Sequence, residues 1–188
     1  DAARGWVDDL HDPDAIDALT PDVVIIATGG LPQNPPIEAG GDLMVNAWDV
    51  VGGDARLTGD VVLYDDDGTH SAMTTAEMLA RSGARVEIVT PERTMGVDVG
   101  GLNLGPYARA FNETDTRVTL NQRVRSISRD QSGRLRVQIG SDHSPVRHDR
   151  LVDAVVGDHG VLANDELYHE LVHASTNLGE LDHRAFID

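Results

Sequence analysis

The residues best placed to do chemistry follow a short apolar segment before the middle of the chain. Residues 61–64 are apolar or aromatic, and Asp65, Asp66, Asp67 and Gly68 come directly after them. In nucleotide-binding folds the turn after such a segment is rich in glycine, so that the backbone can approach a pyrophosphate at a helix N-terminus. Three carboxylates at this position would repel a diphosphate. The turn therefore predicts either a nucleotide fold that has lost its phosphate site or one that binds a nucleotide in a modified way.

The elements around this turn follow a βαβ pattern. Residues 61–64 predict a buried strand, and apolar residues then recur at helical spacing, with Thr69 or Ser71 as the N-cap. Gly83 is typical of the position just after a helix, and residues 84–89 favour a second strand. A strand, a helix and a second strand in about 30 residues predict a βαβ unit with a right-handed crossover.

A second turn with binding potential lies earlier in the chain. Residues 22–26 predict a buried strand, which runs into Ala27, Thr28, Gly29 and Gly30. Two glycines let a ligand approach the backbone, and the Thr28 hydroxyl and adjacent amides offer contacts to a nucleotide. A plain strand-to-loop turn would contain the same residues, so spacing alone leaves both interpretations open. Residues 151–160 resemble this pattern, because an apolar strand there also ends in a glycine-containing turn.

The remaining pattern completes a predicted α/β fold. Residues 33–58 predict connecting loops with one apolar stretch, at 44–51, and residues 104–111 predict a short helix. Residues 117–120 and 151–156 predict strands, and residues 123–139 predict a hairpin around a turn at 130–133. We expect a Rossmann-like domain with an antiparallel meander, inserted at 41–164 into a second nucleotide-fold domain. Pieces of that second domain would lie at 1–40 and 165–188.

The charge of the chain is strongly negative. Its 188 residues include 24 Asp and 8 Glu against 15 basic residues, all of them arginine, and the formal net charge is −17. A surface so acidic and free of lysine is what selection in very high salt would produce, because salt near 1 M screens charges beyond about 3 Å. An acidic face for a basic partner is the alternative, but the aspartates are spread along the whole sequence. The same charge disfavours nucleic-acid binding.

Several classes of site and location are excluded by what the sequence lacks. It contains no cysteine, so it offers neither a disulfide framework nor thiolate ligands for zinc or an iron–sulfur cluster. No apolar run approaches the roughly 20 residues that cross a bilayer, and no signal peptide is present at its start. We expect a soluble cytoplasmic protein with no membrane partner.

One short motif points to a different chemistry. His169, Glu170 and His173 match H-E-x-x-H, in which two histidines on one helix face ligate zinc and the glutamate acts as general base. The longer metzincin form fails, because Thr176 and Gly179 stand where that form has glycine and histidine. We interpret the motif as an incidental surface pair and assign neither metal-binding nor catalytic residues. A zinc hydrolase is kept only as an alternative.

Three stretches resemble the C-terminal half of the trimethylamine dehydrogenase / 2,4-dienoyl-CoA reductase family, multidomain relatives of old yellow enzyme. They are PDVVIIATGG at 21–30, VVLYDDDGTHSAMTTAEMLARSGARVEIVTPER at 61–93 and ELYHELVHASTNLGELD at 166–182. Family members related to N-methylproline demethylases are the most similar, since they also replace the glycine motif with an acidic turn. The resemblance implies a FAD-type (or ADP-binding) domain with an inserted NAD-like domain, arranged as in glutathione reductase.

The resemblance also implies what the rest of such an enzyme contains. An N-terminal barrel, absent from this sequence, would carry FMN and a four-iron cluster and would perform amine dehydrogenation, N-demethylation or enoyl reduction. This region would be an accessory nucleotide-fold part of that flavin-dependent oxidoreductase, inactive alone, with the barrel and an electron-transfer protein as partners in a homo-oligomeric parent.

The resemblance implies that the turn at 27–30 is FAD- or ADP-proximal. It places the acidic turn at 65–68 at the NAD(P) phosphate position, where the acidic residues put NAD(P)H use in doubt. The alternative is a structural Rossmann-like domain that binds no nucleotide. The candidate cofactor-binding residues of the two turns are Ala27, Thr28, Gly29, Gly30, Asp65, Gly68, Thr69, His70 and Ser71.

Overall fold

The chain folds into two compact units, which we describe separately. The structure is a computed structural model that describes residues 12–33 and 37–179. Unit 1 contains the residues up to Leu31 and those from Val161 onward, and unit 2 runs from Pro32 to Gly160. The predicted inserted domain, 41–164, covers most of unit 2.

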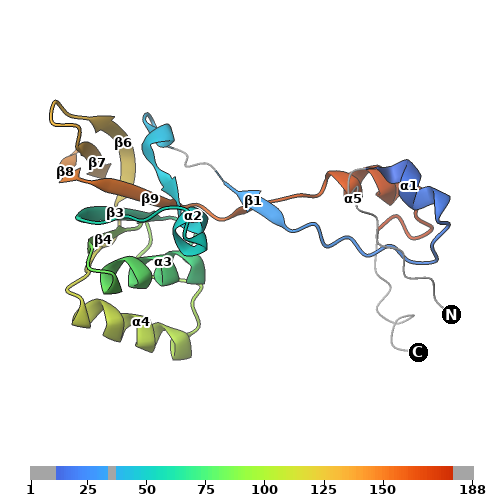
Figure 1. The fold of residues 1–188 in the computed structure, drawn as a ribbon, viewed down its shortest axis with the longest axis horizontal. Helices are drawn as coiled ribbons and strands as arrows, with labels where there is room; N and C mark the ends of the chain where they lie inside the picture. The colour runs from blue at the N-terminus through green and yellow to red at the C-terminus, as the bar shows by residue number, and fades with distance from the viewer. Residues whose placement is uncertain (1–11, 34–36, 180–188) are drawn as a thin grey trace. The chain divides into compact units, whose positions relative to one another are not determined.

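A five-stranded parallel sheet forms the centre of unit 2 (Figure 1). Its strand order is β2-β9-β3-β4-β5, and every neighbouring pair is parallel. The strands are β2 (Val45–Asn46), β9 (Ala154–Asp158), β3 (Asp60–Asp65), β4 (Arg85–Val89) and β5 (Arg117–Thr119). The apolar runs in β3, β4 and β9 reflect burial on both faces, as is typical of parallel sheets. The fold is α/β and Rossmann-like, as the sequence predicts.

Three helices cover one face of this sheet. They are α2 (Ala47–Gly52), α3 (His70–Arg81), which joins β3 to β4, and α4 (Gly101–Glu113), which joins β4 to β5. Apolar side chains of α2 and α3 pack with Val61, Leu63 and Val156 in one core cluster. Gly83 follows the end of α3 with φ of +98°, which confirms its predicted position after the helix. The predicted connector at 33–58 was incomplete, because β2 and α2 lie within it.

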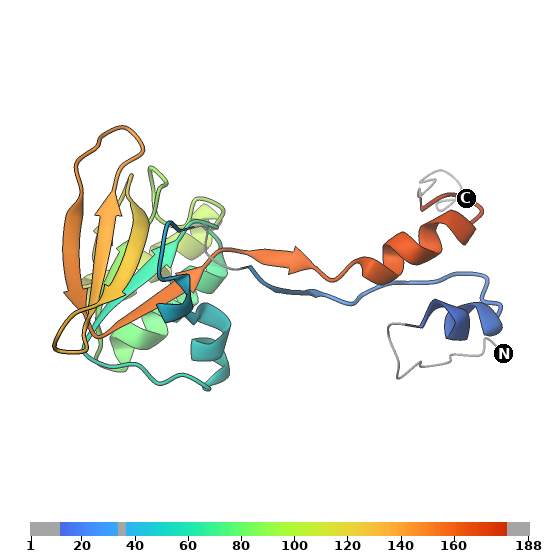
Figure 2. The ribbon, with the colours of Figure 1, turned by 90° about the horizontal axis from the view of Figure 1, so that it is seen from above.

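An antiparallel meander covers the other face. Its strands are β6 (Arg123–Arg129), β7 (Leu135–Gly140) and β8 (His148–Val152), which lie side by side in Figure 2. A second core cluster lies between meander and sheet and includes Val62, Tyr64 and Val155. The predicted hairpin is confirmed, but the single strand predicted at 151–156 is wrong. The chain bends at Asp153, so that β8 ends in the meander and β9 begins in the parallel sheet.

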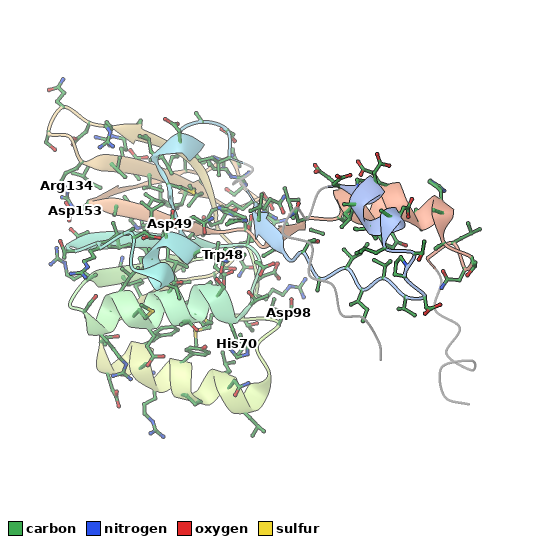
Figure 3. The ribbon with its side chains drawn as sticks, turned by 45° about the vertical axis from the view of Figure 1, so that its right-hand side comes forward. Trp48, Asp49, His70, Asp98, Arg134 and Asp153 are labelled. Carbon is green, nitrogen blue, oxygen red and sulfur yellow. The ribbon has the colours of Figure 1, made fainter. Side chains whose placement is uncertain are left out.

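An ion-pair network joins the meander to the amino ends of the parallel strands. Arg134, in the β6–β7 turn, donates to Asp60 Oδ2 at 2.8 Å and to Asp153 Oδ1 at 3.0 Å. Figure 3 shows Arg134 beside Asp153 at this end of unit 2. Arg85 Nε donates to the other oxygen of Asp60 at 2.7 Å.

Unit 1 consists of short elements. They are α1 (Pro13–Ala18), β1 (Gly30–Pro32, whose last residue belongs to unit 2), β10 (Val161–Ala163), α5 (Glu166–Leu171) and the 3-10 helix η2 (Val172–Ala174). The strand predicted at 22–26 is wrong, since no strand of the described chain pairs with it. The side chains of Val23, Val24 and Ile25 are exposed, with Ile25 at 86%. None of the helices described is long and apolar enough to span a membrane.

Candidate functional site

The carboxyl ends of β3 and β9 meet where a doubly wound sheet binds its ligand. From β3 the chain crosses to β4 and then β5 on one side, while β9 and β2 lie on the other. Such a switch in strand order leaves a crevice at the carboxyl ends of the strands, where nucleotides bind in related folds. The register places Asp65 directly opposite Asp158 at this edge. Five titratable residues gather here: Asp65, Asp66, Asp67, Asp158 and His159.

Asp65 is not part of the open turn that the sequence predicts. It is the last residue of β3 and is fully buried. Its Oδ1 accepts a hydrogen bond from the Gly68 backbone N–H at 2.7 Å. Burial raises the pKa of Asp65 to about 6; the Gly68 hydrogen bond opposes the rise, and the nearby Asp158 adds to it. The backbone amide that a phosphate would use is therefore already bound by a carboxylate of the chain.

Asp158 takes a similar position at the end of β9. It is 4% exposed, and it is hydrogen-bonded by the Ser71 side chain and by the backbone of Gly160. Burial raises its pKa, and the charge of Asp67 acts in the same direction. Ser71, which lies in the first turn of α3, thus stabilises the Asp158 carboxylate.

Asp66 and His159 form a pair on the meander face of the sheet. His159 Nδ1 lies 2.7 Å from Asp66 Oδ1, and its ring packs edge-on against Tyr64 with centroids 5.1 Å apart. Burial raises the pKa of Tyr64 to about 12, with the Asp66 charge as a further cause. Asp66 is therefore also engaged by the protein and not directed toward a ligand.

The other predicted residues of this turn have separate contacts. Thr69 is the N-cap of α3, but its hydroxyl donates to Asp67 Oδ2 at 2.7 Å instead of capping the helix. His70 is exposed at the start of α3, and its Nδ1 lies 3.2 Å from the Tyr107 hydroxyl of α4 (Figure 3). Gly68 has φ of +75°, and a Cβ there would meet the Val97 side chain at 2.5 Å. Backbone conformation and packing explain this glycine without a ligand.

The turn at 27–30 lies in unit 1. The Thr28 hydroxyl donates to the Asn164 carbonyl, and the Asn164 N–H donates to Gly29 at 2.9 Å. A Cβ on Gly30 would meet the Leu162 carbonyl oxygen at 2.3 Å, so this glycine permits close approach of β10. A hollow of about 260 Å³ adjoins the turn. Its lining comprises Ile26, Ala27, Thr28, Gly29, Ala163, Asn164, Asp165 and Tyr168.

The two turns differ in how well they fit a nucleotide. The donors at the acidic turn are occupied by Asp65 and Asp158, and further carboxylates surround them, so the residues present do not fit an NAD(P) diphosphate. The hollow in unit 1 has free space, an aromatic wall at Tyr168 and backbone polar groups nearby. Its volume is below the usual range of about 300–1,000 Å³ for ligand pockets.

The H-E-x-x-H residues do not form a continuous helical motif. His169 lies in α5, which ends at Leu171, and His173 lies in η2. His169 Nε2 is 3.2 Å from Asp165 Oδ2. Within residues 12–33 and 37–179, no group of three or more metal-ligating side chains comes together.

Sequence reasoning missed Asp158 and His159 as partners of the acidic turn. The sequence indicates at this strand end only a resemblance to the strand and turn at 22–30. The available signal was that parallel strands place their carboxyl ends at one edge of a sheet, so that polar residues after two such strands converge.

Known proteins match most of the chain. No family model matches it. A probable N-methylproline demethylase of Rhizobium meliloti (strain 1021) is 43% identical over 174 residues, which cover 93% of this chain and 26% of that protein. The N,N-dimethylglycine/sarcosine dehydrogenase of Chromohalobacter salexigens is 30% identical over 171 residues, covering 87% of this chain and 24% of that protein.

Two solved structures superpose on most of the chain. The 6-hydroxypseudooxynicotine amine oxidase HisD from Pseudomonas geniculata N1 superposes with a TM-score of 0.72 at 26% identity, over 88% of this chain and 25% of that one. A 2-naphthoyl-CoA reductase gives 0.68 at 28% identity, over 88% and 24% of the two chains. The chain belongs to the trimethylamine dehydrogenase / 2,4-dienoyl-CoA reductase family. It spans about a quarter of the length of these family members.

The wider fold is shared with disulfide reductases. The flavoprotein disulfide reductase RclA from Escherichia coli superposes with a TM-score of 0.58 at 21% identity, over 76% of this chain and 31% of that one. This likeness shows the fold alone. Within the trimethylamine dehydrogenase / 2,4-dienoyl-CoA reductase family, the chain corresponds to a C-terminal fragment with an α/β fold.

Proposed function

We propose that the chain is an accessory nucleotide-fold region of a flavin-dependent oxidoreductase that acts on N-methylated amines. Two relatives at 30% identity or more match most of the chain, and their names, N-methylproline demethylase and N,N-dimethylglycine/sarcosine dehydrogenase, support this substrate class over enoyl reduction. The substrate chemistry would take place in a flavin barrel outside this sequence. A flavin there supplies the group that accepts two electrons from the carbon–nitrogen bond.

Within that enzyme, unit 2 would be a structural Rossmann-like domain that binds no NAD(P)H. The observation that carries this proposal is the hydrogen bond from the Gly68 N–H to the buried Asp65 carboxylate. An amide bound by an internal carboxylate cannot also bind a phosphate, and the carboxylates around it oppose an anion. Electrons would then leave the enzyme through a protein acceptor.

Unit 1 would contribute to a site for FAD or ADP. Tyr168 and residues 27–29 line the hollow, and they would contact the adenosine part of either ligand. An aromatic ring beside a base stabilises binding by about 1–3 kcal/mol through stacking.

Calorimetric titration of the chain in multimolar KCl with NADH, NADPH, FAD and ADP tests the proposal. We expect no binding of NADH or NADPH. Any affinity for ADP or FAD should fall about tenfold in Tyr168→Ala. Tyr107→Ala is the matched control, because Tyr107 lies beside the acidic turn and outside the hollow. Micromolar binding of NADH or NADPH would contradict the structural role of unit 2.

A further inference from the structure

Two buried carboxyl groups lie side by side under the start of α3. Asp65 and Asp158 are register partners on neighbouring parallel strands, which run about 4.8 Å apart. Side chains alternate along each strand, so Asp65 shares the helix-covered face with Leu63, and Asp158 shares it with Val156. The exposed fractions of the two residues are 0% and 4%.

Each carboxyl group has hydrogen-bond donors, but not for both of its oxygens. Asp65 is served by the Gly68 N–H at Oδ1 and by the Asp67 backbone, and Asp158 is served by the Ser71 side chain and the Gly160 backbone. The Oδ2 atoms of both residues are buried and have no hydrogen-bond partner in the described part of the chain. A buried acceptor without a donor costs about 1–3 kcal/mol, and an unpaired buried charge costs more.

A single proton held between the two Oδ2 atoms would satisfy both of them. It would make one carboxyl group neutral and give the other Oδ2 a donor, leaving one negative charge for the amide and hydroxyl donors to stabilise. We propose that Asp65 and Asp158 share one proton between their Oδ2 atoms and titrate as a pair. This goes beyond the proposed function, because it holds whether or not the parent enzyme binds any nucleotide.

Two further charged side chains act on this pair of carboxyl groups. Asp67, in the turn after β3, acts on both carboxyl groups and favours retention of the proton. His159, which follows Asp158, acts on Asp158 in the opposite direction, although its ring lies on the meander face beside Asp66. The donors contributed by α3 and by the turns, namely Ser71, Gly68 and Gly160, do not titrate in this range.

The direct test is a titration of the Asp side-chain carboxyl carbons by ¹³C NMR, on the complete chain in multimolar KCl. In the wild type we expect one signal to titrate near pH 6, above the usual range of aspartate. That signal should disappear in Asp65→Asn and should change in Asp158→Asn. Asp98→Asn is the matched control, because its backbone N–H contacts the same turn while its side chain is exposed. Absence of any carboxyl group titrating above its usual range in the wild type overturns the proposal, whether or not the variants fold.

Thermal unfolding gives a second readout with a defined sign. A pKa that is higher in the folded state stabilises the protein at low pH, and this contribution is lost as the pH rises through about 6. The contribution of this pair should therefore make the wild-type melting temperature fall as the pH rises from about 4, the unfolded pKa of aspartate, through about 6, and level off above that. Asp65→Asn should reduce this slope, because its amide donates to Asp158 Oδ2 at every pH. If the melting temperature changed with pH equally in the wild type and in Asp65→Asn, this result would contradict the shared proton.

Discussion

Glu87 shows how one partly buried charge connects the two layers of unit 2. It lies in β4, and its carboxylate accepts from Arg150 of β8 at 2.8 and 3.0 Å and from the Thr119 hydroxyl at 2.7 Å. Burial opposes ionisation, but the hydrogen bonds from Arg150 and Thr119 outweigh it, and the pKa of Glu87 lies below its ordinary value. The exposed fractions of the two charged side chains are 12% and 28%. The bidentate geometry makes this pair stronger than an ordinary surface pair.

Arg150→Ala should therefore lower the free energy of unfolding by about 1–3 kcal/mol at pH 7. The stabilisation is present above the unfolded pKa of glutamate, about 4.3, and is lost as the pH falls below it. Arg136→Ala is the matched control, since Arg136 pairs with Asp149 on the same meander with both side chains about half exposed. That control should lose less than about 1 kcal/mol. Equal losses in urea titrations of the two variants would be the contrary result.

The acidic turn marks the limit of sequence reasoning at the residue scale. The sequence predicts the departure from a glycine-rich turn and its conflict with a diphosphate. It does not predict that Asp65 is buried within β3, because that depends on the register with β9, whose residues are far away in the sequence. Local spacing contains no information on such a non-local pairing.

At the scale of elements, the meander depends on the core that it shares with the sheet. Ile139, in β7, is 1% exposed within this cluster. Ile139→Ala should destabilise unit 2 by about 2–5 kcal/mol through lost burial and the cavity that remains. Leu151→Ala, on the neighbouring strand β8 with 42% exposure, should cost much less. Thermal unfolding of both variants distinguishes them, and a similar melting temperature for the two would contradict this account of the core.

The elements were predicted best where their pattern is local. The βαβ unit from β3 to β4 and the β6–β7 hairpin follow from periodicity, Gly83 and the turn at 130–133. The prediction failed at 151–156, because both strands there are apolar and only Asp153 marks the change of sheet. It also failed at 22–26, because an apolar run becomes a strand only when another strand satisfies its backbone groups.

The net charge of −17 acts on the molecule as a whole. Repulsion among 32 acidic residues destabilises the folded state at low ionic strength. Salt near 1 M screens this repulsion between charges that are more than about 3 Å apart. We expect the melting temperature at fixed pH to rise steadily from 0.1 M KCl, where the screening length is about 10 Å, into the multimolar range. Sucrose at matched viscosity is a control for effects of the medium other than screening. A melting temperature that falls or stays constant with salt would contradict adaptation to high salt.

The absence of lysine has a consequence for the alkaline range. The network of Arg85 and Arg134 around Asp60 contains only guanidinium cations, which stay protonated below about pH 12. Raising the pH therefore leaves this network charged where an ammonium group would lose its proton. Tyr64, whose pKa burial raises to about 12, lies in the core between sheet and meander. The guanidinium groups of this network and the Tyr64 phenol therefore both keep their neutral-pH charge states until the pH approaches about 12.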